Sequence, residues 1–225
     1  MRFQDAAPDA RAVVYAGIQA DPLVASLASL LADATPAERW LARAAMNGQR
    51  TEPETWRRMF PALFGEETAA EDSERAETIL RASLDVANRG ENARQQYRGA
   101  IVEELTQRVL ARRSPQAGPV RRERRVLFDG VRAEIHPYDV TVESPARPEV
   151  YDCKWGARGI NADVLNQLDD ARSHAADEEI DLRVALVVFD ARRSCEIRLE
   201  RSTANRSGTR LVSIEDLGSL AKEDR

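Results

Sequence analysis

The sequence predicts an α/β protein that begins with a helical region. Apolar residues recur at spacings of three and four from residue 8 to about residue 92, where strand signals are nearly absent. After about residue 120 the apolar residues recur with period two, which is typical of strands. The 225 residues are 43% hydrophobic, enough to fill a core. We therefore expect a helical region over residues 1–91, serving specificity, dimerisation or docking, and an α/β domain over residues 92–225.

The N-terminal helices are predicted from their start signals. Asp21-Pro22 precedes one helix, and Thr35-Pro36-Ala37-Glu38 supplies the N-cap, the first-turn proline and the acid of a second. A third should start near Thr51 and carry Trp56, Met59 and Phe60 to its partners. The acidic stretch 65–77 is expected to be partly loop before a further helix.

The second half of the chain predicts alternating strands and helices. A long helix over 92–112 should end at the turn residues 114–119, and a helix over 161–176 should separate two groups of strands. Ser213 should cap a last helix. The predicted strands are 126–128, 133–135, 140–142, 150–151, 184–189, 195–199 and 210–212.

Composition limits the location and the partners. No apolar run approaches the roughly 20 residues of a membrane span, and the N-terminus lacks the layout of a secretion signal, so we expect a cytoplasmic protein without a membrane partner. Cys153 and Cys195 are too few for a disulfide framework or a thiolate zinc site, and we expect both to be reduced and buried. The net charge of −5 argues weakly against nucleic acid, but residues 108–125 are locally basic.

Lys154 is the most informative residue. Of 33 cationic side chains, 31 are arginines, and the other lysine, Lys222, lies in the tail. Arginine supplies charge but cannot release a proton, whereas a lysine can, so an internal lysine suggests a need for an ammonium group. On a strand, Asp152 and Lys154 share one face. If a hairpin pairs this strand with the strand that Asp139 opens, the two carboxylates converge and favour a divalent cation such as Mg²⁺ or Mn²⁺.

Two helices offer further polar groups. On the helix before the strands, Glu103 lies at the border of the apolar arc, and Glu104 is its rival. On the helix after Lys154, Gln167 flanks the apolar face and could reach the carboxylate edge. Glu134 is a rival of Asp139, although Asp139 is followed by the better strand.

These residues carry a family resemblance over roughly residues 95–190. Their order is Gly99, Glu103, Asp139, Asp152-Cys153-Lys154 and Gln167, and it resembles the PD-(D/E)XK, or restriction-endonuclease-like, nuclease superfamily. The resemblance implies a mixed central sheet flanked by helices. It also implies a metal-dependent nuclease, with DNA as the more frequent substrate, in which Glu103, Asp139, Asp152 and the backbone carbonyl of Cys153 hold magnesium or manganese. Lys154 would orient or deprotonate the attacking water, and Gln167 would support the site. The proline of the family name is displaced here to Pro137.

Alternatives stay open. A nucleic-acid contact surface is expected from Trp155 and from six arginines of the basic stretch, namely Arg112, Arg113, Arg121, Arg122, Arg124 and Arg125. A catalytically inactive relative that binds nucleic acid or an acidic partner would use the same basic face. A helical protein with an accidental motif is the third interpretation. Because the sequence contains no recognised DNA-reading module, we expect the protein to act with a protein partner or as a homodimer, in restriction or defence against invading DNA.

Overall fold

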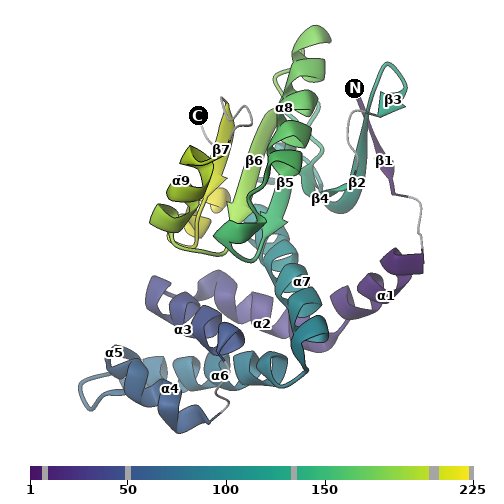
Figure 1. The fold of residues 1–225 in the computed structure, drawn as a ribbon. Coiled ribbons are helices and arrows are strands. Elements are labelled where there is room, and N and C mark those ends of the chain that lie inside the picture. The colour runs from purple at the N-terminus through teal and green to yellow at the C-terminus, as the bar shows by residue number, and fades with distance from the viewer. Residues whose placement is uncertain (7–9, 49–51, 133–135, 203–207, 223–225) are drawn as a thin grey trace. The chain divides into compact units, whose positions relative to one another are not determined.

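A computed structural model describes residues 1–6, 10–48, 52–132, 136–202 and 208–222 (Figure 1). The chain forms two compact units, each described by itself below. The helical unit comprises Arg11–Leu105, and the sheet unit comprises Met1–Ala10 together with Thr106–Arg225. The unit boundaries therefore fall inside two helices, one over residues 10–19 and one over residues 91–110.

The helical unit follows the predicted start signals. Thr35 and Glu38 form a reciprocal capping box, in which the Glu38 backbone donates to the Thr35 hydroxyl and the Glu38 carboxylate accepts from the Thr35 backbone. A cluster around Leu41, Trp56 and Leu80 fills the space between helices, whereas Met59 is 61% exposed and does not pack as expected. The helices are α1 (Ala10–Gln19), α2 (Pro22–Asp33), α3 (Pro36–Asn47), α4 (Pro53–Met59), α5 (Pro61–Phe64), α6 (Ala70–Ala87) and α7 (Glu91–Leu110).

The sheet is mixed, as predicted. Its path in the described residues runs β1-β2-β4-β5-β6-β7, and β3 pairs with β2 beside that path. The pairs from β1 to β5 are antiparallel, whereas β5, β6 and β7 run parallel. The strands are β1 (Arg2–Asp5), β2 (Val120–Phe128), β3 (Val131–Arg132), β4 (Tyr138–Val142), β5 (Glu149–Lys154), β6 (Arg183–Val188) and β7 (Thr209–Val212).

Helices provide the parallel connections and cover the sheet. The helix α8 (Ala162–Asp177) connects β5 to β6 and lies along the sheet (Figure 1). Its buried Leu165 and Leu168 belong to the same apolar cluster as Val184 and Leu186 of β6. The helix α9 (Arg192–Glu200) connects β6 to β7. Short 3₁₀ helices complete the unit at η1 (Pro115–Ala117), η2 (Ala157–Gly159) and η3 (Leu217–Ala221).

Several predicted elements differ from the structure. The alternating residues 195–199 form part of α9, not a strand, because Cys195 and Leu199 are one helical turn apart and both pack on the core. The strand β1 was not predicted, since it is a short, largely exposed edge strand with little apolar patterning. The start of the chain therefore belongs to the sheet unit, and not to the helical region as expected. After Ser213 the chain forms the 3₁₀ helix η3. The predicted strand 133–135 lies outside the described residues, as does Glu134.

Within the described part of the chain, no single helix is long and apolar enough to cross a membrane; one bent pair, Val13–Gln19 with Pro22–Asp33, meets the length and composition test when joined.

Candidate active site at the ends of β4 and β5

The sheet brings the start of β4 beside the end of β5. The two strands are antiparallel, with Val140 opposite Tyr151 and Thr141 opposite Val150. Asp139 is the second residue of β4, and Lys154 is the last residue of β5. The hairpin that the sequence predicted is therefore present, and it gathers the predicted polar residues at one edge of the unit.

Asp139 is fixed by the neighbouring strand. Its Oδ2 accepts a hydrogen bond of 2.5 Å from the backbone N–H of Cys153, between Asp152 and Lys154. The Asp139 side chain is 18% exposed, so solvent still reaches the carboxylate. A carboxylate held by a backbone amide has a defined orientation before any ligand arrives.

Lys154 lies against both carboxylates. Its ammonium forms an ion pair with Asp152 Oδ1, and its Nζ is 4.0 Å from Asp139 Oδ2. Burial lowers the pKa of Lys154, but the charges of Asp139 and Asp152 outweigh burial, so the pKa lies above its ordinary value. Lys154 is therefore charged at neutral pH in the protein without a metal.

The charge balance of this cluster fits a divalent cation. Asp139 and Asp152 bring two carboxylates to one ammonium, that of Lys154. The Asp152 side chain is 10% exposed, and its Oδ1 is paired with the Lys154 ammonium. Partly buried carboxylates held close together favour a cation, and oxygen donors of this kind suit Mg²⁺ or Mn²⁺.

Glu123 is a fourth charged group that the sequence interpretation missed. One of its carboxylate oxygens and one of Asp139 lie within 4.8 Å of each other. Glu123 lies on β2, which pairs with β4, and it has a left-handed φ of 53°. A signal was present, since Glu123 is the single acid in the arginine-rich stretch. Its side chain adds a carboxylate beside Asp139.

Gln167 supports the cluster through the main chain. Its Oε1 accepts from the backbone N–H of His136 at 3.3 Å, and its Nε2 donates to the backbone carbonyl of His136 at 3.1 Å. Its own carbonyl accepts from the Tyr138 hydroxyl at 3.3 Å. Gln167 thus holds the backbone at His136, in the segment that leads into Asp139. The sequence interpretation placed Gln167 correctly on its helix, but the side-chain amide of Gln167 bonds to the backbone of His136.

Glu103 is held inside the helical unit. It is 5% exposed, and its two carboxylate oxygens accept from the Tyr15 hydroxyl at 2.6 Å and from Gln19 Nε2 at 2.8 Å, both on α1. Glu104, its rival on the same helix, is half-buried. Because Glu103 and Asp139 belong to different units, the joint metal site stays a prediction. The backbone carbonyl of Cys153 as a metal ligand also stays a prediction.

Comparisons with known proteins add one structural similarity. The sequence matches no protein-family model and no curated protein. The crystal structure of protein VC1899 from Vibrio cholerae is similar at 18% sequence identity, with a TM-score of 0.49. The similarity covers 98% of this chain and 56% of VC1899, so the chain spans little more than half of that protein.

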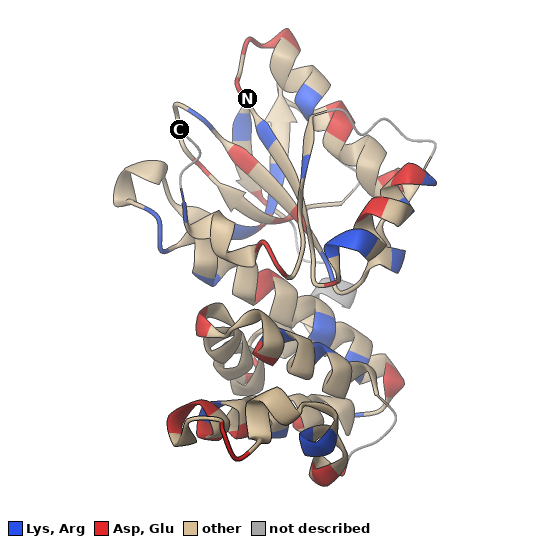
Figure 2. Ribbon diagram, turned by 90° about the vertical axis from the view of Figure 1, so that its left-hand side faces the viewer, with Lys and Arg blue, Asp and Glu red and all other residues tan. Residues whose placement is uncertain are grey.

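The predicted basic surface is only partly present. Arg113 is buried with a side chain 3% exposed, and it pairs with Glu149 at 2.7 Å, so the prediction that it contacts nucleic acid is wrong. Burial next to a carboxylate is the reason. Arg112 and Arg121 are exposed, whereas Arg122, Arg124 and Arg125 are half-buried on β2. In Figure 2 both charge signs occur in each unit.

Trp155 lies directly after the lysine. Its ring stacks on Phe189, with 5.0 Å between centroids, and the side chain is half-buried. This contact joins the end of β5 to the end of β6. The stack accounts for Trp155 structurally, and its predicted contact with nucleic acid stays a prediction.

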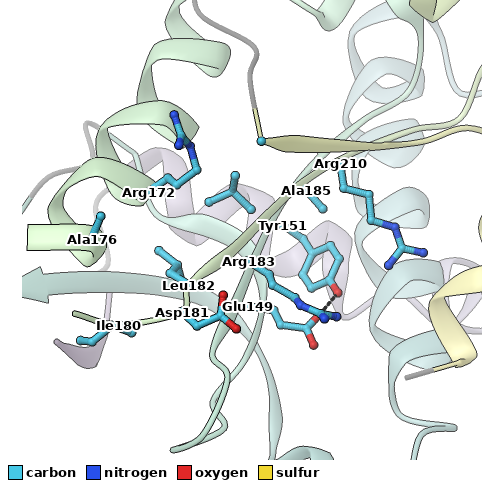
Figure 3. Close-up of a pocket in the computed structure, with 12 residues that line it drawn as sticks. Glu149, Tyr151, Arg172, Ala176, Ile180, Asp181, Leu182, Arg183, Ala185 and Arg210 are labelled. Atoms are coloured by element: carbon cyan, nitrogen blue, oxygen red, sulfur yellow. Dashed lines mark hydrogen bonds between the residues drawn. The ribbon is translucent and has the colours of Figure 1, made fainter. Parts of the chain in front are cut away.

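A cavity of about 450 Å³ lies elsewhere in the sheet unit (Figure 3). Glu149 and Tyr151 of β5 line it, and Tyr151, the nearer of the two, is three residues or about 10 Å along the strand from Lys154. Arg172 lies on one side of it and Arg210 on the other. Arg172 donates a hydrogen bond to Asp169, and Arg210 donates one to Ser219. The charged groups do not converge on one point, so the Lys154 cluster is the better candidate site.

Proposed function

We propose that this protein is a metal-dependent nuclease that hydrolyses phosphodiester bonds of nucleic acid, with DNA as the expected substrate. The observation that carries the proposal is the Lys154 ammonium beside two carboxylates from the ends of adjacent strands. A phosphodiester is negatively charged and repels hydroxide, so its hydrolysis needs positive charge at the phosphate. The cluster offers one fixed cation and the oxygen donors for another.

Asp139 and Asp152 would hold the metal. The resemblance adds Glu103 and the Cys153 carbonyl, and Glu123 lies close enough to Asp139 to contribute. When bound, Mg²⁺ or Mn²⁺ supplies a Lewis acid and lowers the pKa of a bound water. The hydrogen bond from the Cys153 amide holds the Asp139 carboxylate in place, which lowers the reorganisation needed on binding.

Lys154 would act first as a charge. Because its pKa lies above the ordinary value, its ammonium is protonated and donates hydrogen bonds. A donor beside the attacked phosphate orients the attacking water and stabilises the charge that develops on the phosphate oxygens. The sequence suggested two roles for Lys154, orienting the water and deprotonating it, and the Lys154→Arg variant described below separates them.

The biological setting follows from the resemblance. We propose a role in restriction or defence against invading DNA, together with a protein partner or as a homodimer. The alternative is an inactive relative that binds nucleic acid through the exposed arginines Arg112 and Arg121. The two functions differ in turnover, which a cleavage assay measures.

The test is cleavage of single- and double-stranded DNA and RNA with Mg²⁺, Mn²⁺ or EDTA. Asp152→Asn and Lys154→Met should each lower the rate by about 100-fold or more, and circular dichroism should show that both variants stay folded. Lys222→Met is the matched control, because Lys222 is the other lysine of the chain and is exposed. Salt-dependent binding without turnover in any divalent metal would favour the inactive relative.

Lys154→Arg separates the two roles of the lysine. Arginine keeps the charge but cannot release a proton. If Lys154 acts as a charge, Lys154→Arg should retain more activity than Lys154→Met. Equal loss in the two variants would indicate that proton release is required.

A further inference from the structure

Gly159 packs against the aliphatic part of Lys154. A Cβ atom added at Gly159 would lie 3.0 Å from Lys154 Cβ and Cδ and 3.1 Å from Cγ. Such distances are shorter than ordinary carbon contacts of about 3.5–4.0 Å. An alanine here would therefore press on the lysine stem, which would have to shift by a few tenths of an ångström. Gly159 does not have a left-handed φ, so the backbone itself would accept an alanine.

The 3₁₀ helix η2, which ends at Gly159, is anchored to its surroundings. The Ala157 N–H donates to Asp190 Oδ2 at 2.9 Å, just after β6. Arg198 of α9 donates from Nε to the Ile160 carbonyl at 2.9 Å. Within the turn, the Gly159 N–H donates to the Gly156 carbonyl at 2.8 Å. Because η2 is held from both sides, an added atom at Gly159 should displace the lysine rather than the turn.

The strand end under Lys154 is held as well. The backbone carbonyl of Lys154 accepts from the Phe189 N–H at 2.9 Å, and the next residue, Trp155, stacks on the Phe189 ring. The freedom left to Lys154 is therefore in its side chain. That side chain is 27% exposed, and η2 bounds it on the side where Gly159 lies.

We propose that Gly159 and η2 form a clamp that positions Lys154, by selecting the side-chain conformation that places the ammonium beside Asp152 and Asp139. This inference rests on the proposed function, in which Lys154 acts at the phosphate. The atoms nearest to a Cβ added at Gly159 belong to the aliphatic stem of Lys154, so Gly159 is a positioning residue and takes no part in the chemistry.

Gly159→Ala tests the clamp through kinetics. A displaced ammonium should lower kcat about 10- to 100-fold, while KM and the melting temperature stay near the values of the unchanged protein. Gly218→Ala is the matched control, since Gly218 also lies in a 3₁₀ helix of the sheet unit and an added Cβ meets nothing within 4 Å. The control should leave kcat unchanged.

A second measurement needs neither substrate nor metal. The chain has two lysines, so reductive methylation followed by peptide mass spectrometry reports the reactivity of Lys154 relative to the exposed Lys222 in the same molecule. In the unchanged protein Lys154 should react more slowly, because its ammonium is ion-paired and mostly buried. Gly159→Ala should raise the ratio severalfold, and Gly218→Ala should not.

Arg198→Met provides a second variant in case Gly159→Ala does not fold. It removes the anchor of η2 to α9 without adding an atom beside Lys154, and it should raise the methylation ratio in the same direction. Unchanged methylation ratios in folded Gly159→Ala and Arg198→Met would overturn the clamp. A raised ratio in a protein that cleaves no nucleic acid would support the clamp and reject the nuclease function, so the two failures are distinguishable.

Discussion

Tyr15 donates a hydrogen bond of 2.6 Å to Glu103, and Gly99 leaves the space in which it does so. A Cβ added at Gly99 would lie 2.9 Å from the Tyr15 hydroxyl oxygen. The three residues lie in the helical unit, one turn of α7 separating Gly99 from Glu103. A glycine inside a helix normally costs stability, so this glycine has a packing reason.

The Tyr15–Gly99 contact predicts non-additive effects on stability. Tyr15→Phe should cost about 1 kcal/mol, because Glu103 loses a hydrogen-bond donor. Gly99→Ala should destabilise the unchanged protein through the close contact. In the Tyr15→Phe background the same alanine should stabilise by up to about 1 kcal/mol, since the clash is gone and alanine is the better helix former. Urea unfolding of the four proteins measures this coupling.

Tyr97→Phe is the matched control for that cycle. The Tyr97 hydroxyl donates to Asp21, also in the helical unit, and Tyr97 is not among the atoms that an added Cβ at Gly99 would meet. Its effect on stability should therefore be the same with glycine and with alanine at position 99. Additive effects of Tyr15→Phe and Gly99→Ala would contradict the contact.

The Cys153–Asp139 hydrogen bond predicts a difference between two substitutions at Asp139. Asp139→Asn removes the charge but keeps an oxygen that can accept from the Cys153 amide, so the melting temperature should stay within a few degrees while cleavage is lost. Asp139→Ala also leaves the Cys153 amide without its acceptor and should lower the free energy of unfolding by about 1–3 kcal/mol more. Thermal unfolding and cleavage assays on both variants check this. Full activity in Asp139→Asn would remove Asp139 from the site.

The part of the site that the sequence could predict is the part that adjacent strands determine. Asp152 and Lys154 share a face because of strand geometry, and the turn after Val142 brings Asp139 to them. Glu123 stood out in the sequence as the single acid among arginines, but its approach to Asp139 depends on how β2 pairs with β4, which the local pattern does not determine. The sequence could not predict the actual bonds of Gln167 either, since a helical position fixes a direction but not a partner.

The fold divides in the same way. Helices with caps, such as the one that Thr35 starts, were predicted from local signals. The edge strand β1 depends on β2, more than a hundred residues away, and its own four residues carry almost no pattern. The residues around Cys195 show alternation that fits both a strand and one helical turn, and packing on the core decides for the helix.

Glu38 predicts a pH-dependent term in stability. Burial raises the pKa of this carboxyl, but hydrogen bonds from Arg75 and Thr35 outweigh burial, so the pKa lies below its ordinary value of 4.5. The contribution is therefore present above about pH 4.5 and is lost as the pH falls through the lowered pKa. Glu38→Gln should cost about 1–2 kcal/mol at pH 7 and progressively less towards pH 3.

Asp72→Asn is the matched control for Glu38. Asp72 pairs with the same Arg75, but its side chain is 54% exposed, whereas that of Glu38 is 1% exposed. The asparagine should change the free energy of unfolding by less than about 0.5 kcal/mol at any pH. Chemical denaturation at a series of pH values measures both variants. A difference for Glu38→Gln that is constant between pH 7 and pH 3 would contradict the assigned pKa direction.

Arg113 predicts a large effect on stability without an effect on nucleic-acid binding. Its guanidinium donates to Glu149, to the Tyr151 hydroxyl at 3.2 Å and to the Leu220 carbonyl at 2.6 Å, so it ties β5 to η3 inside the sheet unit. Arg113→Met would leave the buried Glu149 uncompensated and should cost about 3–5 kcal/mol. The exposed neighbour gives the control, since Arg112→Met should change stability by less than about 0.5 kcal/mol.

The double variant Arg113→Met/Glu149→Leu distinguishes a buried ion pair from simple packing. Removing both charges should recover much of the lost stability, because no uncompensated charge stays buried. DNA affinity measured across salt concentrations separates the surface from the interior. If Arg112 contacts phosphate, the slope of log affinity against log salt concentration should become shallower by about one unit in Arg112→Met. The slope should not change in the folded double variant. A reduced slope in the double variant would return Arg113 to the nucleic-acid surface.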